Sequence, residues 1–205
     1  LITTLTGTDR VTCLAIDDGK LYCGGDGNIQ IWNCSTDTLI KTLTEPNGTV
    51  DCLIIHDGKL YSGDSHGAIL VWNCSNHAII KILGLPDDDE EEFFDEGHFA
   101  GVLCLTINDN KLYSGSLDRR IKVWDCSTNQ LITTLTEKYG IERLLIHGGK
   151  LYSKGFGTIS VYDCSNDTII TTVKEDTHYV NCLEFHNGKL YTGGLDCMIN
   201  VYDCS

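Results

Sequence analysis

The sequence predicts an all-β fold made of five tandem repeats, each forming a four-stranded antiparallel sheet. Two short phrases recur along the chain, and the first, Lys-Leu-Tyr, returns at steps of 39, 52, 39 and 39 residues. Such a period is typical of repeat architectures, and 21 glycines against 2 prolines suit many short strands joined by tight turns. Lys-Leu-Tyr begins at Lys20, Lys59, Lys111, Lys150 and Lys189, and the second phrase, an aromatic residue followed by Asn or Asp and then Cys-Ser, begins at Trp32, Trp72, Trp124, Tyr162 and Tyr202.

Four strands, a to d, are expected in each repeat from alternating apolar residues and turn signals. After strand a comes a turn with Asp-Gly, Gly-Gly or Asn-Gly, dipeptides that accept the positive φ of a tight hairpin. Strand b starts with Lys-Leu-Tyr, strand c is exemplified by 121–125, and strand d by 131–136. Strand a is expected at 11–16, 50–55, 102–107, 141–146 and 180–185. We interpret residues 1–205 as one domain, with repeats at about 1–38, 39–78, 79–130, 131–168 and 169–205.

The third repeat carries a distinctive set of polar residues: Gly97-His98, Ser114-Gly115-Ser116, Asp118 and Trp124-Asp125. With these residues the chain resembles the WD-repeat (tryptophan-aspartate repeat) β-propeller family. The resemblance implies that His98, Ser114, Asp118 and Trp124 form a structural hydrogen-bond chain tying three strands of a blade together. The other repeats depart from this pattern, so we expect them to depend more on apolar packing between blades.

The order of strands predicts a closed, five-bladed antiparallel β-propeller. Residues 1–6 are identical to the strand d segment 131–136, and the chain ends where a last strand d would follow. The N-terminal strand would then complete the last blade and hide the edge strands. A closed ring favours a monomer. An array completed by another chain, or a longer propeller, is the alternative.

An acidic insert lengthens the third repeat between its strand d and the next strand a. It holds eight acidic residues and two adjacent phenylalanines. One interpretation is a solvated loop, because like charges repel. The other is a docking element for a basic protein or peptide, with the phenylalanines as apolar anchors. Its candidate partner-binding residues are Asp87, Asp88, Asp89, Glu90, Glu91, Glu92, Phe93 and Phe94.

The loops on the same face as the insert differ between repeats, whereas the framework does not. Variable loops on a repeated framework are the better place to seek a partner site. We therefore add Arg119, Arg120, Tyr139 and Tyr179 to the candidate partner-binding residues. A simpler interpretation of Arg119-Arg120 is that it neutralises the insert.

Composition narrows the function classes. A net charge of −14 disfavours nucleic acid and anionic membranes as partners. Eleven cysteines, an odd number without any C-x-x-C, recur mostly at repeat positions, which favours buried thiols in a cytoplasmic protein. Histidines at 56, 147 and 186 recur in one turn position, but blades should hold them too far apart for a metal, and no metal or cofactor is expected.

The sequence thus predicts a non-enzymatic scaffold that binds other proteins or peptides, because it contains no catalytic motif. Two alternatives stay open. The first is a lectin-like propeller with equivalent sugar pockets between blades. The second is the substrate-recruiting propeller of a larger ubiquitin-ligase or kinase protein, which the Lys-Leu-Tyr-Ser-Gly and Ile-Lys-Val-Trp-Asp phrases resemble.

Overall fold

All regular elements of the described residues are β-strands. The computed structural model describes residues 3–7, 10–85, 96–174, 180–194 and 197–204. The predicted partner-binding residues Asp87 to Phe94 and Tyr179 lie outside them. The strands are β1 Val11–Asp17, β2 Lys20–Asn33, β3 Thr38–His56, β4 Lys59–Asp64, β5 Ile69–Asn73, β6 Ile79–Leu83, β7 Val102–Asn108, β8 Lys111–Ser116, β9 Arg120–Asp125, β10 Leu131–Thr136, β11 Ile141–His147, β12 Lys150–Gly155, β13 Thr158–Asp163, β14 Thr168–Lys174, β15 Val180–His186, β16 Lys189–Gly194 and β17 Ile199–Asp203.

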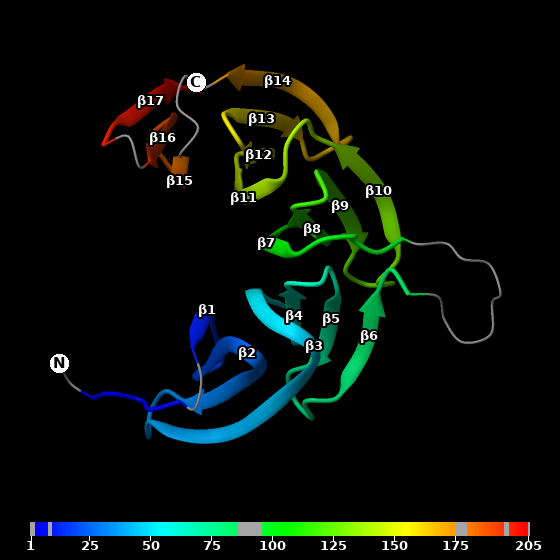
Figure 1. Ribbon diagram of the computed structural model, residues 1–205, viewed down its shortest axis with the longest axis vertical. Helices are drawn as coiled ribbons and strands as arrows, with labels where there is room; N and C mark the ends of the chain where they lie inside the picture. The colour runs from blue at the N-terminus through cyan, green and yellow to red at the C-terminus, as the bar shows by residue number, and fades with distance from the viewer. Residues whose placement is uncertain (1–2, 8–9, 86–95, 175–179, 195–196, 205) are drawn as a thin grey trace.

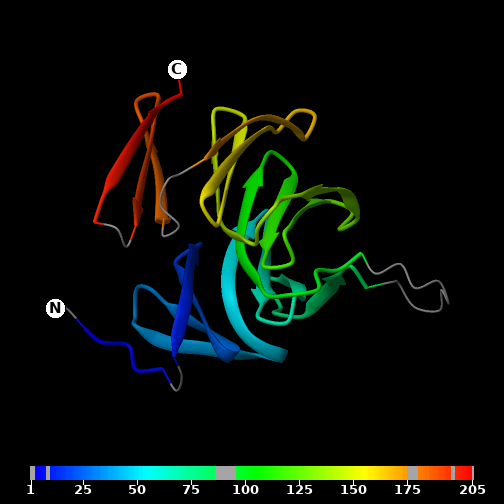
Figure 2. The ribbon, with the colours of Figure 1, turned by 45° about the horizontal axis from the view of Figure 1, so that its top comes forward.

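The strands form antiparallel blades that follow one another around a common centre (Figures 1 and 2). Blade 1 is β1, β2 and the first part of β3, and blade 2 is the rest of β3 with β4, β5 and β6. Blade 3 is β7 to β10, blade 4 is β11 to β14, and blade 5 is β15 to β17. The strand a elements β1, β7, β11 and β15 lie nearest the centre in Figure 1. This architecture confirms the predicted all-β antiparallel fold.

The blades form an open arc, and the predicted closing strand is absent from the described residues. Thr3–Gly7 belong to no strand, and β17 is the edge of a three-stranded sheet. Both ribbon views show an opening between blade 1 and blade 5, with the N-terminal segment directed away from β17 (Figures 1 and 2). Residues 3–7 pair with no strand here, so this threonine-rich segment forms no sheet ladder.

The hydrophobic core consists of four clusters, each between two consecutive blades. Between blades 3 and 4, Ile121 and Val123 pack with Ile141 and Leu151, and all four are 0 % exposed. The same repeat positions form the other clusters. The repeat cysteines of the inner blades fill small spaces in these clusters, as predicted. The buried ones are Cys52, Cys74, Cys104, Cys126 and Cys164.

A polar contact, which we call the blade latch, ties blade 3 to blade 4. Lys111 Nζ of blade 3 donates to the Cys164 carbonyl of blade 4 at 3.0 Å and lies 2.7 Å from Asp167 Oδ2. Tyr113 OH donates to Asp167 Oδ1 at 2.9 Å. Lys59 of blade 2 donates to a blade 3 carbonyl in the same way. The Lys-Leu-Tyr and Cys-Ser phrases, which recur in step along the sequence, therefore meet between neighbouring blades.

The same pairing of tyrosine and cysteine recurs at the remaining interfaces. Burial raises the pKa of the tyrosine phenol in each case, and the repeat cysteine of the next blade adds to the shift. The pairs are Tyr22 with Cys74, Tyr61 with Cys126 and Tyr152 with Cys204. Each blade thus offers its tyrosine on one face and its cysteine on the other.

The two ends of the arc expose faces that are buried everywhere else. Ile199 of blade 5 is 75 % exposed, whereas the equivalent Ile121 of blade 3 is 0 % exposed. On blade 1, Val11 is 54 % exposed, whereas Val102 is 0 % exposed. Cys34 of blade 1 is exposed as well, unlike the inner latch cysteines. The ends therefore present the two unmatched halves of an ordinary blade interface.

Candidate functional site

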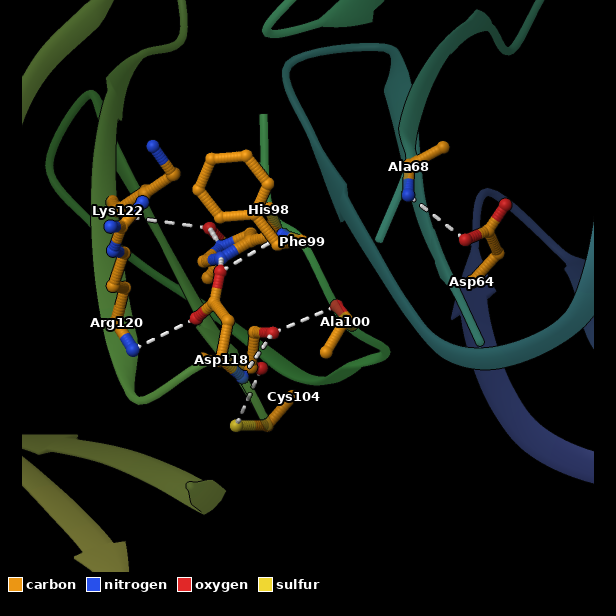
Figure 3. Close-up of polar contacts among 12 residues, drawn as sticks. Asp64, Ala68, His98, Phe99, Ala100, Cys104, Asp118, Arg120 and Lys122 are labelled. Atoms are coloured by element: carbon orange, nitrogen blue, oxygen red, sulfur yellow. Dashed lines mark hydrogen bonds and ion pairs between the residues drawn. The ribbon is translucent and has the colours of Figure 1, made fainter. Parts of the chain in front are cut away.

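The loops between strands b and c and between strands d and a lie on one rim of the arc, which we call the loop rim. In blade 3 a buried hydrogen-bond chain supports this rim (Figure 3). His98 Nδ1 lies 2.8 Å from Asp118 Oδ2, and His98 Nε2 lies 2.8 Å from Ser114 Oγ. Trp124 Nε1 donates to the same Ser114 Oγ at 2.9 Å. The four side chains that the family resemblance singled out are therefore directly connected, and they have a structural role.

Asp118 also shapes the loop around it. Its carboxylate accepts the Phe99 N–H at 3.1 Å and the Arg120 N–H at 2.9 Å, as Figure 3 shows. Burial alone would raise the pKa of Asp118, but the hydrogen bonds from His98 and the backbone outweigh it and lower the pKa. Asp118 therefore fixes the positions from which Phe99 and Arg120 project.

Blades 2 and 4 use a glutamate where blade 3 uses the histidine, so they also contain a polar network, made of partly different residues. In blade 2, Trp72 Nε1 donates to Ser62 Oγ at 2.9 Å, and Ser62 donates to Glu45. Glu45 is 4 % exposed, and burial raises its pKa to about 7 although the Ser62 hydrogen bond opposes the shift. Burial favours the neutral, protonated form of the Glu45 carboxyl, because the charged form loses more solvation than the neutral form does.

The blade 4 network also ends on a glutamate, but here a tyrosine and a serine of strand β13 donate to it directly. Tyr162 OH donates to Glu137 Oε1 at 2.8 Å, and Ser160 Oγ donates to Glu137 Oε2 at 3.0 Å. The sequence carried a signal for both networks that our sequence analysis missed. Leu-Thr-Glu ends strand d at 43–45 and again at 135–137.

The described loops of blades 3 and 4 bring together a set of exposed and half-exposed basic and aromatic side chains. Arg120 lies over the Phe99 ring at 4.8 Å from its centroid, and Lys138 lies over Tyr139 at 5.0 Å. The Tyr139 and Phe156 rings meet edge to face with centroids 5.8 Å apart. We call this set the cation–aromatic patch; it consists of Phe99, Arg119, Arg120, Lys138, Tyr139 and Phe156.

Backbone contacts make the patch continuous across the two blades. Glu137 N–H donates to the Arg119 carbonyl at 2.8 Å, which holds the β10–β11 link against the β8–β9 loop. Gly140 packs on Leu117 so closely that a Cβ there would lie 3.1 Å from Leu117 Cα. Of the predicted partner-binding residues, Arg119, Arg120 and Tyr139 thus lie together.

A hollow of about 610 Å³ opens on the loop rim beside blades 2 and 3. Its lining includes Pro46, His66 and Leu85, together with His98, which precedes Phe99 of the patch. Its lining is both polar and apolar, and of its two histidines His98 is already bonded to Asp118 and Ser114. The hollow therefore adds shape to the rim and brings no cluster of catalytic groups.

The recurring turn histidines lie away from any ligand-like arrangement. His147 stacks on the Phe185 ring with centroids 3.8 Å apart. Within the described residues, no three His, Cys, Asp or Glu side chains gather as metal ligands would. His147 thus serves packing between blades 4 and 5.

Comparison with known families identifies the repeat. The family described as "WD domain, G-beta repeat" matches residues 1–33, 91–125 and 167–203, just over half of the chain. The chain belongs to this WD40 family. The third repeat, in which the His98 network lies, falls largely in the second matched segment. The repeats with glutamate networks lie mainly between the matched segments.

Curated relatives of this WD40 chain are much longer than it. Mitochondrial division protein 1 of Eremothecium gossypii is 25% identical over 199 residues, which is 95% of this chain and 26% of that protein. Zinc finger CCCH domain-containing protein 17 of Oryza sativa subsp. japonica is 29% identical over 132 residues, 64% of this chain and 28% of that protein. A probable E3 ubiquitin ligase complex SCF subunit sconB, from Talaromyces marneffei, is 49% identical over 41 residues, 20% of this chain and 6% of that protein.

Solved structures share the fold at lower identity. A structure titled "Structure of U3-55K" matches 98% of this chain and 63% of its own, with 21% identity and a TM-score of 0.81. A chain of the "Crystal Structure of Mitotic Checkpoint Complex" matches 98% of this chain and 63% of its own length, with 20% identity and a TM-score of 0.82.

The described part of the WD40 chain contains no helix long and apolar enough to cross a membrane.

Proposed function

We propose that this WD40 chain is a non-enzymatic scaffold that binds other proteins through its loop rim. One observation carries the proposal: the five blades repeat one framework, whereas the rim loops differ from blade to blade. The polar networks under the rim bond its loops to the strands below, as Asp118 does for Phe99 and Arg120, which supports a structural role for them. Membership of a family of interaction scaffolds supports the proposal.

A basic protein or peptide is the partner that we propose for the acidic insert. The insert brings eight acidic residues and two phenylalanines to the β6–β7 connection. Its flanks, Leu85 and Glu96, are exposed and lie beside the hollow and the Gly97-His98 pair. An acidic segment with apolar anchors suits a basic surface, where charge speeds association and the rings supply contact area.

A comparative pull-down from cell lysate tests this proposal. The bait is the chain, either intact or with Asp87 to Glu96 replaced by a neutral Gly/Ser loop of equal length. We expect basic partners to be lost with the insert, and lost from the intact bait as salt is raised.

A matched control replaces Asp17 and Asp18, acidic residues in a turn on the opposite rim, by Asn and Gly. This bait should retain the partners of the intact chain. An unchanged partner list after replacement of the insert would contradict the proposed role of the insert, and losses from the control bait alone would place binding on the opposite rim.

A role as the substrate-recruiting part of a ubiquitin ligase is a second candidate. The 41-residue match to a probable SCF subunit supports it at the level of the repeat. Mass spectrometry of the same pull-downs tests it. Recovery of ubiquitin-ligase subunits or substrates with the intact chain is the expected result, and their absence would contradict this second candidate.

The lectin alternative receives no support from the packing. A sugar-binding propeller would need the repeat aromatics open to solvent between blades. Trp72, Trp124 and Tyr162 are instead 4 %, 1 % and 5 % exposed. They fill the spaces in which equivalent sugar pockets would lie.

Closure of the ring by the N-terminal strand remains a proposal, supported by the identity of 1–6 with β10 and by the apolar end faces. By the register of β9 and β10, Leu5 would then lie opposite Ile199, as Leu135 lies opposite Ile121. In a closed ring Leu5→Arg should lower the unfolding free energy by about 2 kcal/mol or more, since it buries a charge. An unchanged value would contradict closure by this strand.

A further inference from the structure

We propose that the cation–aromatic patch is a docking surface for an acidic segment of a partner protein that also carries apolar side chains. The inference rests on the proposed function, because it takes the loop rim as the binding face. It adds a second site, of opposite charge preference to the acidic insert.

The exposure of aromatic side chains singles out this patch. Phe99 and Phe156 are 56 % and 43 % exposed, and they are the only exposed aromatic side chains among the described residues. Both belong to the patch, and Leu117, which packs on Gly140 in the same rim, is 52 % exposed. Exposed aromatic rings that gather at one place mark interaction sites more often than scattered apolar residues do.

The cations of the patch lack carboxylate partners within the described part of the chain. Arg119, Arg120 and Lys138 take part in none of the ion pairs there, although the whole chain carries a net charge of −14. The two acidic neighbours are already engaged, since Asp118 is bonded to His98 and Glu137 to Tyr162 and Ser160. These carboxylates therefore hold the loops and leave the positive charge of the patch available.

The geometry of the cations suits carboxylate groups. The Arg120 guanidinium lies over the Phe99 ring, and the Arg120 backbone N–H donates to Asp118. These contacts limit the positions that the guanidinium can take before a partner binds. An arginine side chain can bind a carboxylate with two parallel hydrogen bonds, and less entropy is lost when the group is already ordered. Phe99 and Phe156 lie next to the cations and can cover apolar side chains of the same segment.

A protein segment fits this surface better than a nucleic acid does. Three cations on a chain with 29 acidic and 15 basic residues cannot follow a phosphate backbone beyond the patch. A short acidic segment needs only a few contacts, and the surrounding negative charge disfavours longer acidic chains. Alternating acidic and apolar residues match the alternation of cations and rings.

Fluorescence anisotropy with a labelled twelve-residue peptide of repeated Glu-Phe-Asp-Leu units tests the proposal at low salt. We expect saturable binding to the intact chain, weakened by at least tenfold in the double variant Arg119→Glu, Arg120→Glu. Phe99→Ser should weaken it by about threefold to tenfold. Lys41→Glu, which reverses an exposed cation on the outer strand of blade 1, is the matched control and should leave the affinity within twofold.

Each other result overturns the proposal. Equal weakening by Lys41→Glu would mean nonspecific attraction, and equal binding of a peptide with Gly in place of Phe and Leu would mean that the rings play no part. Binding seen only after the acidic insert is replaced by the Gly/Ser loop would mean that the chain's own insert occupies the patch. Thermal unfolding monitored by circular dichroism verifies that every variant is folded.

The peptide assay and the pull-down can fail separately. If partners depend on the acidic insert but the acidic peptide does not bind, the patch proposal is wrong and the proposed function stands. If the peptide binds through Arg119 and Arg120 while the partner list ignores the insert, the patch stands and the role of the insert is wrong.

Discussion

Replacing Glu45 by glutamine should make the protein more stable at alkaline pH, a result opposite to the usual effect of disturbing a buried network. Glu45 is 4 % exposed, receives a hydrogen bond from Ser62, and has a second carboxylate oxygen without a partner. Glutamine keeps an oxygen for Ser62 and removes the charge. The variant therefore imitates the protonated glutamic acid that burial favours.

The size of the effect follows from the pKa. Burial raises the pKa of Glu45 from 4.5 to about 7 in the folded protein. The folded state thus keeps this proton to a higher pH than the unfolded chain does. The favourable contribution is fully present below the unfolded pKa and is lost as pH rises through the folded pKa. At about 1.4 kcal/mol per pH unit, the loss between pH 5 and pH 8 is about 2–3 kcal/mol.

Urea unfolding followed by tryptophan fluorescence at pH 5, 6, 7 and 8 measures this, with Trp72 close to the site. The quantity of interest is the unfolding free energy of Glu45→Gln minus that of the wild type, because other titrating groups cancel in the difference. We expect this difference to rise by about 2–3 kcal/mol from pH 5 to pH 8.

The equivalent variant in blade 4 is the control. Both Glu137 oxygens accept hydrogen bonds, from Tyr162 and Ser160, so Glu137→Gln should lower stability by about 1–3 kcal/mol at pH 8. A Glu45→Gln difference that stays flat from pH 5 to pH 8 would refute the reasoning, as would a loss of stability at pH 8 as large as that of the control.

Three further predictions concern the blade interfaces. Tyr113→Phe removes a hydrogen bond to the Asp167 carboxylate and should lower the unfolding free energy by about 1.5–3 kcal/mol in urea unfolding. A loss below roughly 0.5 kcal/mol would show that the latch is not stabilising. Ile121→Ala should lower the unfolding free energy by about 2–5 kcal/mol, whereas Ile199→Ala should lower it little, because Ile199 is exposed in the open arc. Equal losses, measured on a monomer verified by size-exclusion chromatography, would indicate that the ring is closed. A thiol reagent should modify exposed cysteines such as Cys34 in the native protein far faster than the buried repeat cysteines, and uniform rates would contradict the packing.

Repetition made most of this fold predictable from sequence. The hairpin between strands a and b recurs with its turn dipeptide, so strands such as 131–136 were predicted with the same bounds that β10 has. Period-2 alternation and turn residues are local signals, and here five copies reinforce one another. The His98 network was predicted from the family resemblance, because the third repeat carries the residue types of the family at the family's positions.

Two kinds of feature were harder to predict: networks in which another residue type replaces the histidine, and surfaces assembled from loops far apart in the sequence. Glu45 and Glu137 take the structural place of a histidine with a different residue type, so a search for the Gly-His pattern passes over them. The cation–aromatic patch joins residues from four loops, and only the blade arrangement brings Phe99 and Phe156 to one surface. Closure was predicted from strand order, but strand order does not determine the angle between blades.

The blade latch has a direction, and this makes whole repeats exchangeable. Lys59 and Lys111 each donate to the cysteine carbonyl of the succeeding blade, and tyrosine and cysteine pair in the same order at the other interfaces. A duplicated or transplanted repeat would therefore bring both matching surfaces with it, while its rim loops could differ freely. The length of the array and the choice of partner can change independently, through gain of a repeat in one case and through substitutions in a loop in the other.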